Sequence, residues 1–171
     1  FIDNGNENTR DGGAIYLEYS TKVIGCTVSG STAKYGAGIY AQKDITITVY
    51  GGTFENNSAS GNGGAISVGQ DAVVDIKEYN GSPTYFLANS SASFGGALDI
   101  ETSNSKKDNK INNAIFKGNH SNYGGAVEVY GNLKKSTTKA YFNSCIFGGS
   151  EDGDANYASH ATEKAHGGVM F

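Results

Sequence analysis

Apolar and polar residues alternate over short stretches that recur along the chain, each directly after a pair of near-adjacent glycines. The first glycines of these pairs lie at positions 12, 36, 63, 95, 124 and 167, so the intervals are 24, 27, 32, 29 and 43 residues. The stretches read Gly12-Gly13-Ala14-Ile15-Tyr16, Gly36-Ala37-Gly38-Ile39-Tyr40, Gly63-Gly64-Ala65-Ile66-Ser67, Gly95-Gly96-Ala97-Leu98-Asp99, Gly124-Gly125-Ala126-Val127-Glu128 and Gly167-Gly168-Val169-Met170-Phe171. A repeat in this range predicts an architecture of stacked supersecondary units.

A second motif precedes each glycine pair: an apolar anchor residue, two variable residues, then Asn or Ser. Its copies are Phe1 and Asn4, Val28 and Ser31, Phe54 and Asn57, Phe86 and Asn89, Phe116 and Asn119, and Phe147 and Ser150. In the four middle copies the glycine pair follows the anchor by eight or nine residues. Each unit therefore consists of an anchor, a short Asn/Ser loop, a Gly-Gly turn, a strand and a return of variable length.

The identical register of the units predicts ladders of stacked side chains on parallel strands. Within each strand after a glycine pair, alternate residues share one face. The inward-facing residues are Ile15, Ile39, Ile66, Leu98 and Val127, and Phe54, Phe86, Phe116 and Phe147, with Val28 in the same slot, form a second ladder. Neighbouring units would stack about 4.8 Å apart. We therefore predict an all-β fold, a right-handed parallel β-helix of about five to six coils.

Turn residues in this scheme have defined tasks. The motif Asn is expected to bond nearby backbone groups and to adopt a left-handed conformation, and the double glycine to allow a sharp corner. Residues 77–83 contain the single proline and predict a turn, and residues 102–110 predict a polar loop. In the longest return, residues 148–166, we expect one short helix over 154–166.

Composition places the chain in one domain and excludes some partners. The 171 residues include 25 glycines and carry a net charge of −4. An acidic chain lacks the basic stripe that nucleic acid requires, and the short pairs Lys106-Lys107 and Lys134-Lys135 are interpreted as solvated loop charges. No apolar run is long enough to span a membrane. Because neither end resembles a solubilising cap, we expect residues 1–171 to be one β-helix segment of a longer chain or of a filament.

The paired motifs resemble the repeats of the polymorphic outer-membrane proteins of chlamydiae and of related large surface proteins. Residues 54–66, Phe-Glu-Asn-Asn-Ser-Ala-Ser-Gly-Asn-Gly-Gly-Ala-Ile, match the signature without a gap, and the likeness extends over about five units. The second unit (Gly-Ala-Gly-Ile, Val28 and Ser31) and the last unit depart from it. The resemblance implies a right-handed parallel β-helix, display outside the cell and a role in adhesion. In that family, adhesion has been linked to the tetrapeptide motifs. In the predicted ladders, however, the anchors of those motifs are buried.

Cysteine, histidine and acidic residues are candidates for a disulfide or a metal site. Cys26 and Cys145 both lie two residues before an anchor, on the interior side, and four units or about 19 Å apart. This is too far for a disulfide, so we predict two small buried apolar residues. The acidic run 151–154 lacks the ligand spacing of a Ca²⁺ hand, and His160 with His166 makes a weak Zn²⁺ site. No metal or cofactor is predicted, although bound Ca²⁺ at 151–154 stays open.

Other polar residues are assigned to the surface. His120 follows a motif Asn and is expected there. Sequons for N-glycosylation begin at Asn56, Asn80, Asn89 and Asn119. Of these, Asn80 is the most plausible acceptor, because Asn89 and Asn119 are motif positions.

Carboxylates on the outward side of the strands raise an enzymatic alternative. The outward column is Tyr16, Tyr40, Ser67, Asp99 and Glu128, with Glu101 two residues beyond Asp99. Carbohydrate-active β-helix enzymes, lyases or hydrolases, place carboxylates on such a face, at defined separations. The single arginine, Arg10, lies at the N-terminal edge. We therefore interpret these groups as exposed charges on a solvated face and predict no catalytic residues.

The preferred function is that of an extracellular structural or adhesive segment, a surface adhesin stalk or filament subunit. Its expected partners are a receptor or glycan on a host or neighbouring cell, or a second copy stacked end to end. The alternative, a polysaccharide lyase or hydrolase, requires carboxylates and a basic residue that converge on one face.

Overall fold

The fold is known from a computed structural model, which describes residues 1–102, 107–131 and 139–159. In these ranges the chain forms short strands joined by turns. It contains no helix there, and therefore no helix that is long and apolar enough to cross a membrane. Some residues named above lie outside the described ranges. These are Lys106, Lys134, Lys135, His160, His166 and the last glycine pair, Gly167-Gly168.

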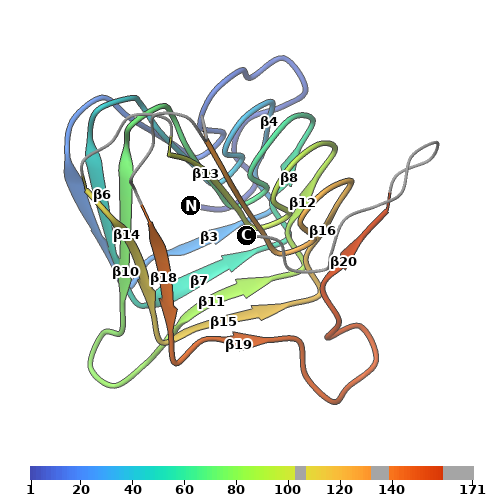
Figure 1. Cartoon of the computed structure of the whole chain (residues 1–171). Coiled ribbons are helices and arrows are strands. Elements are labelled where there is room, and N and C mark those ends of the chain that lie inside the picture. The colour runs from blue at the N-terminus through green and yellow to red at the C-terminus, as the bar shows by residue number, and fades with distance from the viewer. Residues whose placement is uncertain (103–106, 132–138, 160–171) are drawn as a thin grey trace.

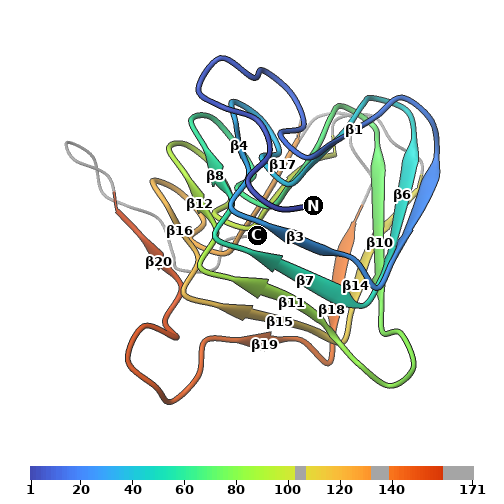
Figure 2. The same ribbon diagram turned by 180° about the vertical axis from the view of Figure 1, so that it is seen from behind.

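The strands form four parallel sheets that make the walls of a coil (Figures 1 and 2). The first sheet contains β1 (Ile15–Leu17), β5 (Ile39–Ala41), β9 (Ile66–Val68), β13 (Leu98–Glu101) and β17 (Val127–Tyr130). The second contains β2 (Thr21–Ile24), β6 (Thr46–Tyr50), β10 (Val73–Lys77), β14 (Asn109–Asn112) and β18 (Ala140–Asn143). The third contains β3 (Thr27–Ser29), β7 (Gly52–Glu55), β11 (Thr84–Leu87), β15 (Ala114–Lys117) and β19 (Ile146–Phe147). The fourth contains β4 (Thr32–Ala33), β8 (Ser58–Ala59), β12 (Ser90–Ser91), β16 (His120–Ser121) and β20 (Tyr157–Ala158).

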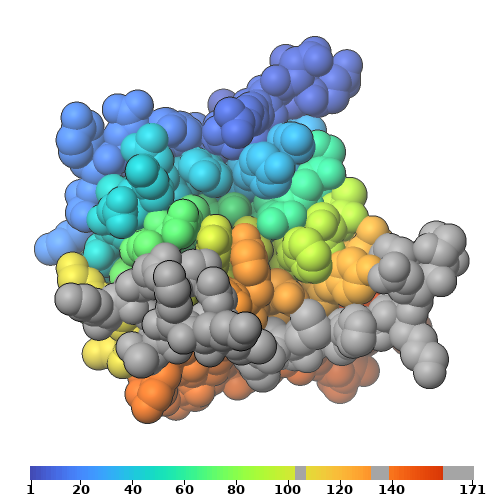
Figure 3. Space-filling view, turned by 45° about the horizontal axis from the view of Figure 1, so that its top comes forward, coloured from blue at the N-terminus to red at the C-terminus, as the bar shows by residue number. Residues whose placement is uncertain are grey.

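Each sheet receives one strand from every coil, in chain order, so the predicted fold class, a parallel β-helix, is confirmed. The coils appear as successive coloured bands in the space-filling view (Figure 3). Five strands per sheet span about four full turns, rather than the five to six coils expected. The expectation was too high because it counted motifs, whereas a turn is complete only between two equivalent strands.

Both predicted ladders line the interior. Ile15, Ile39, Ile66, Leu98 and Val127 are in register across the first sheet. Val28, Phe54, Phe86, Phe116 and Phe147 are in register across the third. The phenylalanine rings stack with centroids 4.8–5.2 Å apart, and the three central rings are fully buried. Fully burying such a side chain stabilises the fold by about 1.5–3 kcal/mol.

A third interior ladder, which the sequence analysis did not identify, runs along the second sheet. Its members are Val23, Val49, Ile76, Ile111 and Phe142. They pack in the same core as the two other ladders. The variable returns therefore supply one complete wall of the coil.

The motif asparagines form a buried ladder of side-chain amides at the corner between the third and fourth sheets. Asn89 Nδ2 donates to the Phe54 carbonyl at 2.9 Å, and Asn89 Oδ1 accepts from the backbone N–H and the side chain of Asn57. Asn119 and Asn156 repeat the arrangement in the next coils.

These bonds run between coils, so the expectation of local bonding is wrong for Asn57, Asn89 and Asn119. It is confirmed in the first copy, where Asn4 Nδ2 donates to the Ile2 carbonyl at 3.1 Å. The left-handed conformation also lies elsewhere. The residue before the motif Asn adopts it, as at Asn56 (φ 54°) and Ala88 (φ 50°). The reason is that this preceding turn directs the amide inward, where the side chains of Asn89 and Asn119 each take part in four hydrogen bonds.

The two glycines of each pair have different tasks at the corner before the first sheet. The first has positive φ, as at Gly63 (64°) and Gly95 (61°), a region that side chains disfavour. The second lies against the next coil, so that a Cβ on Gly96 would overlap the Gly125 carbonyl oxygen. The predicted sharp corner is confirmed.

The returns differ in part from expectation. The turn predicted within 77–83 is present, with Tyr79 and Ser82 exchanging two backbone hydrogen bonds of 2.9 Å. The end of the loop predicted over 102–110 is wrong, because residues 109 and 110 belong to β14. The helix expected over 154–166 is wrong for its described part, because Asn156 joins the amide ladder and β20 pairs with β16.

Candidate functional site

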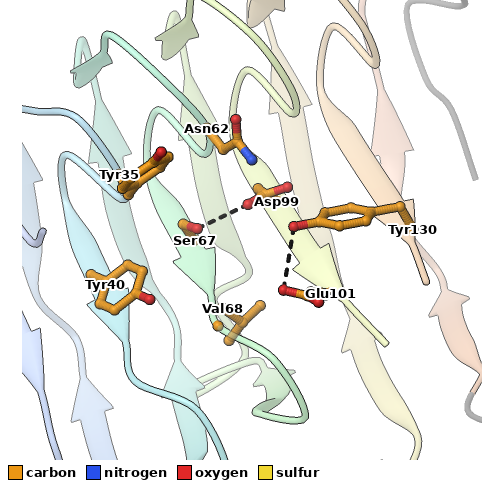
Figure 4. A pocket seen from close by; sticks show the side chains of 9 residues that line it. Tyr35, Tyr40, Asn62, Ser67, Val68, Asp99, Glu101 and Tyr130 are labelled. Atoms are coloured by element: carbon orange, nitrogen blue, oxygen red, sulfur yellow. Dashed lines mark hydrogen bonds between the residues drawn. The ribbon is translucent and has the colours of Figure 1, made fainter. Parts of the chain in front are cut away.

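The outward face of the first sheet carries a pocket of about 240 Å³. Its floor comes from Ser67 on β9 and from Asp99 and Glu101 on β13 (Figure 4). Its sides come from Tyr35, Tyr40, Asn62, Val68, Gly69 and Tyr130. The alternation of each strand directs these floor residues outward while Ile66, Leu98 and Ile100 enter the core.

Asp99 and Glu128 are not the exposed charges that the sequence predicted. The outward register is confirmed, since Tyr16, Tyr40, Ser67, Asp99 and Glu128 pair in one column. However, only 2% of Asp99 and 5% of Glu128 are exposed. Around Asp99, the Tyr130 ring crosses from β17 and Asn62 approaches from the corner before β9, so the face is covered there (Figure 4).

The Asp99 carboxyl group has one oxygen bonded and one without a partner. The Ser67 hydroxyl donates to Oδ2 at 2.9 Å. Oδ1 is buried and accepts no hydrogen bond within the described structure. A buried polar atom in this state costs free energy that a ligand with a suitable donor could recover.

Burial changes the protonation of the two carboxyl groups. Desolvation raises the pKa of Asp99 to about 7; Ser67 and Asn62 partly oppose this, and the charges of Glu128 and Glu101 add to it. Desolvation alone raises the pKa of Glu128 to about 7. Both groups therefore exchange protons near neutral pH, where a solvated carboxyl group would be ionised.

Tyrosine rings flank the carboxylates. Tyr40 stacks on Tyr16 with centroids 5.7 Å apart, and Tyr130 reaches Glu101 through its hydroxyl at 3.5 Å. Desolvation raises the pKa of both Tyr40 and Tyr130, with neighbouring carboxylates adding to the effect. Both hydroxyls thus remain protonated donors at neutral pH, and the rings supply apolar faces on two sides of the pocket.

The arrangement offers hydrogen-bond acceptors, aromatic faces and proton exchange, but no assembled metal site. Among the described residues no three His, Cys, Asp or Glu side chains are grouped so that they could hold a metal ion. In the run 151–154, the Asp154 carboxylate accepts from Lys117 at 2.9 Å, which supplies its counter-charge. Glu151 and Asp152 are exposed.

The remaining candidate residues, Cys26, Cys145, His120 and Arg10, lie outside the pocket. Cys26 and Cys145 are free thiols that pack against the core, but they are partly buried rather than buried as predicted. His120 is half-buried rather than on the surface, because its ring stacks on Tyr157 at 5.0 Å. Burial lowers the pKa of His120. Arg10 is exposed beside Asp11.

Two of the four sequons lie in the amide ladder. Asn89 and Asn119 are fully buried, whereas Asn56 and Asn80 are exposed. Asn80 lies at the tip of the turn before Pro83, with φ 51°. The preference for Asn80 as an acceptor is compatible with this position and stays a prediction.

Tyr35, Asn62 and Tyr130 were missed by sequence reasoning, although each has a recurrent position. Tyr35 and Asn62 directly precede the first glycine of a pair, a column that also contains Asp11, Phe94 and Tyr123. Phe94 and Tyr123 stack at 5.2 Å, which shows that this column is also in register. Tyr130 pairs with Glu101, so it has the same outward register as that carboxylate.

Comparison with known proteins identifies one unit of the repeat. Residues 51–69 match the model of the Chlamydia polymorphic membrane protein repeat. This stretch contains β7, β8, the Gly63-Gly64 corner and β9, so the repeat recognised in the sequence is confirmed there. No curated protein and no solved structure matches the chain.

Proposed function

We propose that the chain is part of an extracellular, surface-displayed β-helix of an adhesin or filament, in which the coil is a scaffold and an outer face makes contact with a partner. The match of residues 51–69 to a repeat of polymorphic membrane proteins carries this proposal. The partner is a receptor on a host or neighbouring cell, and the alternative partners are a glycan and a second copy of the chain.

Burial of the repeat motif supports the division between scaffold and contact face. Phe54, Phe86 and Phe116 and the asparagines three residues on are fully buried. In the folded chain these residues have no surface to offer to a receptor. Contact must therefore involve outward side chains, and the pocket beside Asp99 is a place on the outer face where polar groups converge.

Two experiments test the proposal. Antibodies against the chain should label intact cells of the source organism, whereas labelling only after permeabilisation would contradict surface display. The fluorescent chain should bind cultured cells saturably. Binding lost after removal of surface glycans would identify a glycan, and light scattering that shows only self-association would favour the filament.

We further propose that the chain has no enzymatic activity, although the pocket gives the alternative a specific basis. Asp99 and Glu101 converge there, and Asp99 carries a pKa suited to a general acid. Among the described lining residues there is no Lys or Arg to act as the base of a lyase. Polysaccharide depolymerisation assays with and without Ca²⁺ should show no turnover. Turnover lost in Asp99→Asn would establish the enzyme instead.

A further inference from the structure

The unpartnered oxygen of Asp99 is the feature of the outer face that most directly indicates a ligand. It belongs to Asp99, a residue that is only 2% exposed and that lines the pocket on the first sheet. Figure 4 shows the group between Ser67 and Tyr130, below Asn62. Buried acceptors are normally paired, whereas this atom accepts no hydrogen bond within the described residues.

The electrostatics around this oxygen favour a cation. Glu101 on the same strand and Glu128 on the neighbouring strand both act on Asp99 as like charges. No Lys or Arg lies among the described residues that line the pocket. Buried carboxylates are stable as ions only with a counter-charge and hydrogen bonds. A cation inserted here would supply both.

The walls have the chemistry that suits such a cation. Tyr35, Tyr40 and Tyr130 line the same pocket. Aromatic faces attract ammonium and guanidinium groups through the ring quadrupole, most strongly where water is excluded. A volume of about 240 Å³ is below the range of drug-sized ligand sites and suits the end of one side chain.

We propose that this pocket binds the cationic end of a lysine or arginine side chain presented by a partner protein, an inference that rests on the proposed adhesive function. The ammonium or guanidinium group donates to Asp99 Oδ1 and lies between Tyr40 and Tyr130. A quaternary ammonium has no N–H to donate to this oxygen. A neutral sugar would bring no positive charge to the Asp99 carboxylate.

Binding by this route depends on pH. The groups facing Asp99 are Glu101 on β13, Glu128 and Tyr130 on β17, and Ser67, Asn62 and the more distant Tyr40 from the preceding coils. The cation favours ionised Asp99, and the tyrosines stay neutral over this range. Affinity should therefore increase from about pH 5.5 to about pH 8.

The test is a titration of the ¹⁵N-labelled chain by NMR. The probes are Nα-acetyl-lysine methylamide, the arginine analogue, the neutral Nα,Nε-diacetyl-lysine methylamide, and choline. We expect saturable amide shifts at Ser67, Asp99 and Tyr130 with lysine and arginine, and at least about tenfold weaker binding of the two other probes. Asp99→Asn should weaken lysine binding about tenfold or more. The matched control Glu55→Gln, on the third sheet, should leave it unchanged.

Several results would overturn the inference. These are no saturable shift, equal binding of lysine and its diacetylated form, binding of choline as tight as that of lysine, or an unchanged affinity in an Asp99→Asn variant with a dispersed spectrum. The outcome is separate from that of the proposed function. If cell binding persists in Asp99→Asn, the adhesive role stands and the pocket is not the contact site. If the chain binds lysine but does not bind cells, the pocket stands as a cation site and the adhesive role is refuted.

Discussion

Removal of one asparagine from the amide ladder should destabilise the whole coil. In Asn89→Ala the backbone N–H of Asn57 loses its acceptor, and the Phe54 carbonyl loses a donor. Each buried group left without a partner costs about 1–3 kcal/mol. The sum, about 2–5 kcal/mol with some relaxation, is a large fraction of the 5–15 kcal/mol that typically separates folded from unfolded protein.

The assay is urea unfolding followed by tyrosine fluorescence and far-UV circular dichroism. Asn122→Ala is the matched control, since Asn122 makes one hydrogen bond, to the Ala92 carbonyl, on the exposed side of the coil. It should cost less than about 1 kcal/mol. If the free energy of unfolding of Asn89→Ala lies within that same margin of the unsubstituted chain, the ladder is not a major stabilising element and the reasoning is refuted.

Three further changes test the rest of the scaffold. Ile66→Asp places an unpaired charge in the first ladder and should cost several kcal/mol; unchanged thermal stability would contradict the ladder. Gly96→Ala should prevent native packing, because its Cβ would overlap the Gly125 carbonyl, and native-like far-UV circular dichroism and melting would contradict this. Burial raises the pKa of Asp99 to about 7 in the folded chain, against about 3.9 when unfolded. Between these two pKa values the folded chain binds more protons than the unfolded chain. The contribution of Asp99 to the free energy of unfolding is therefore fully present below about pH 4 and is lost as the pH rises through about 7. The slope of urea midpoint against pH should be shallower in Asp99→Asn, and parallel profiles would refute the assignment.

The ladders of the first and third sheets could be predicted because each has a fixed offset from a visible marker. The ladder of the second sheet also has a regular offset, five residues before the anchor, at Val23, Val49, Ile111 and Phe142. In one unit the turn at 79–82 lengthens the chain, so Ile76 lies ten residues before Phe86. That single insertion concealed the period.

The sequence predicts that the side chains of the candidate site point outward, but it does not predict which residues surround and bury them. Strand parity gives the outward register of Asp99, Glu101 and Tyr130. It does not say that the Tyr130 ring crosses to the preceding strand, or that Asn62 approaches from a corner (Figure 4). Burial of Asp99, and with it the raised pKa and the unpartnered oxygen, depends on these contacts between coils.

The central claim is that the repeat motif builds the interior and leaves recognition to the outer face. The most direct test is solvent exchange of the asparagine side-chain amides, measured by NMR on the ¹⁵N-labelled chain. The Nδ2 protons of Asn57, Asn89 and Asn119 should exchange slowly, because they are buried and bonded between coils. Those of the exposed Asn56 and Asn80 should exchange rapidly. Rapid exchange at all five positions would show that the motif is displayed to solvent and would contradict the account.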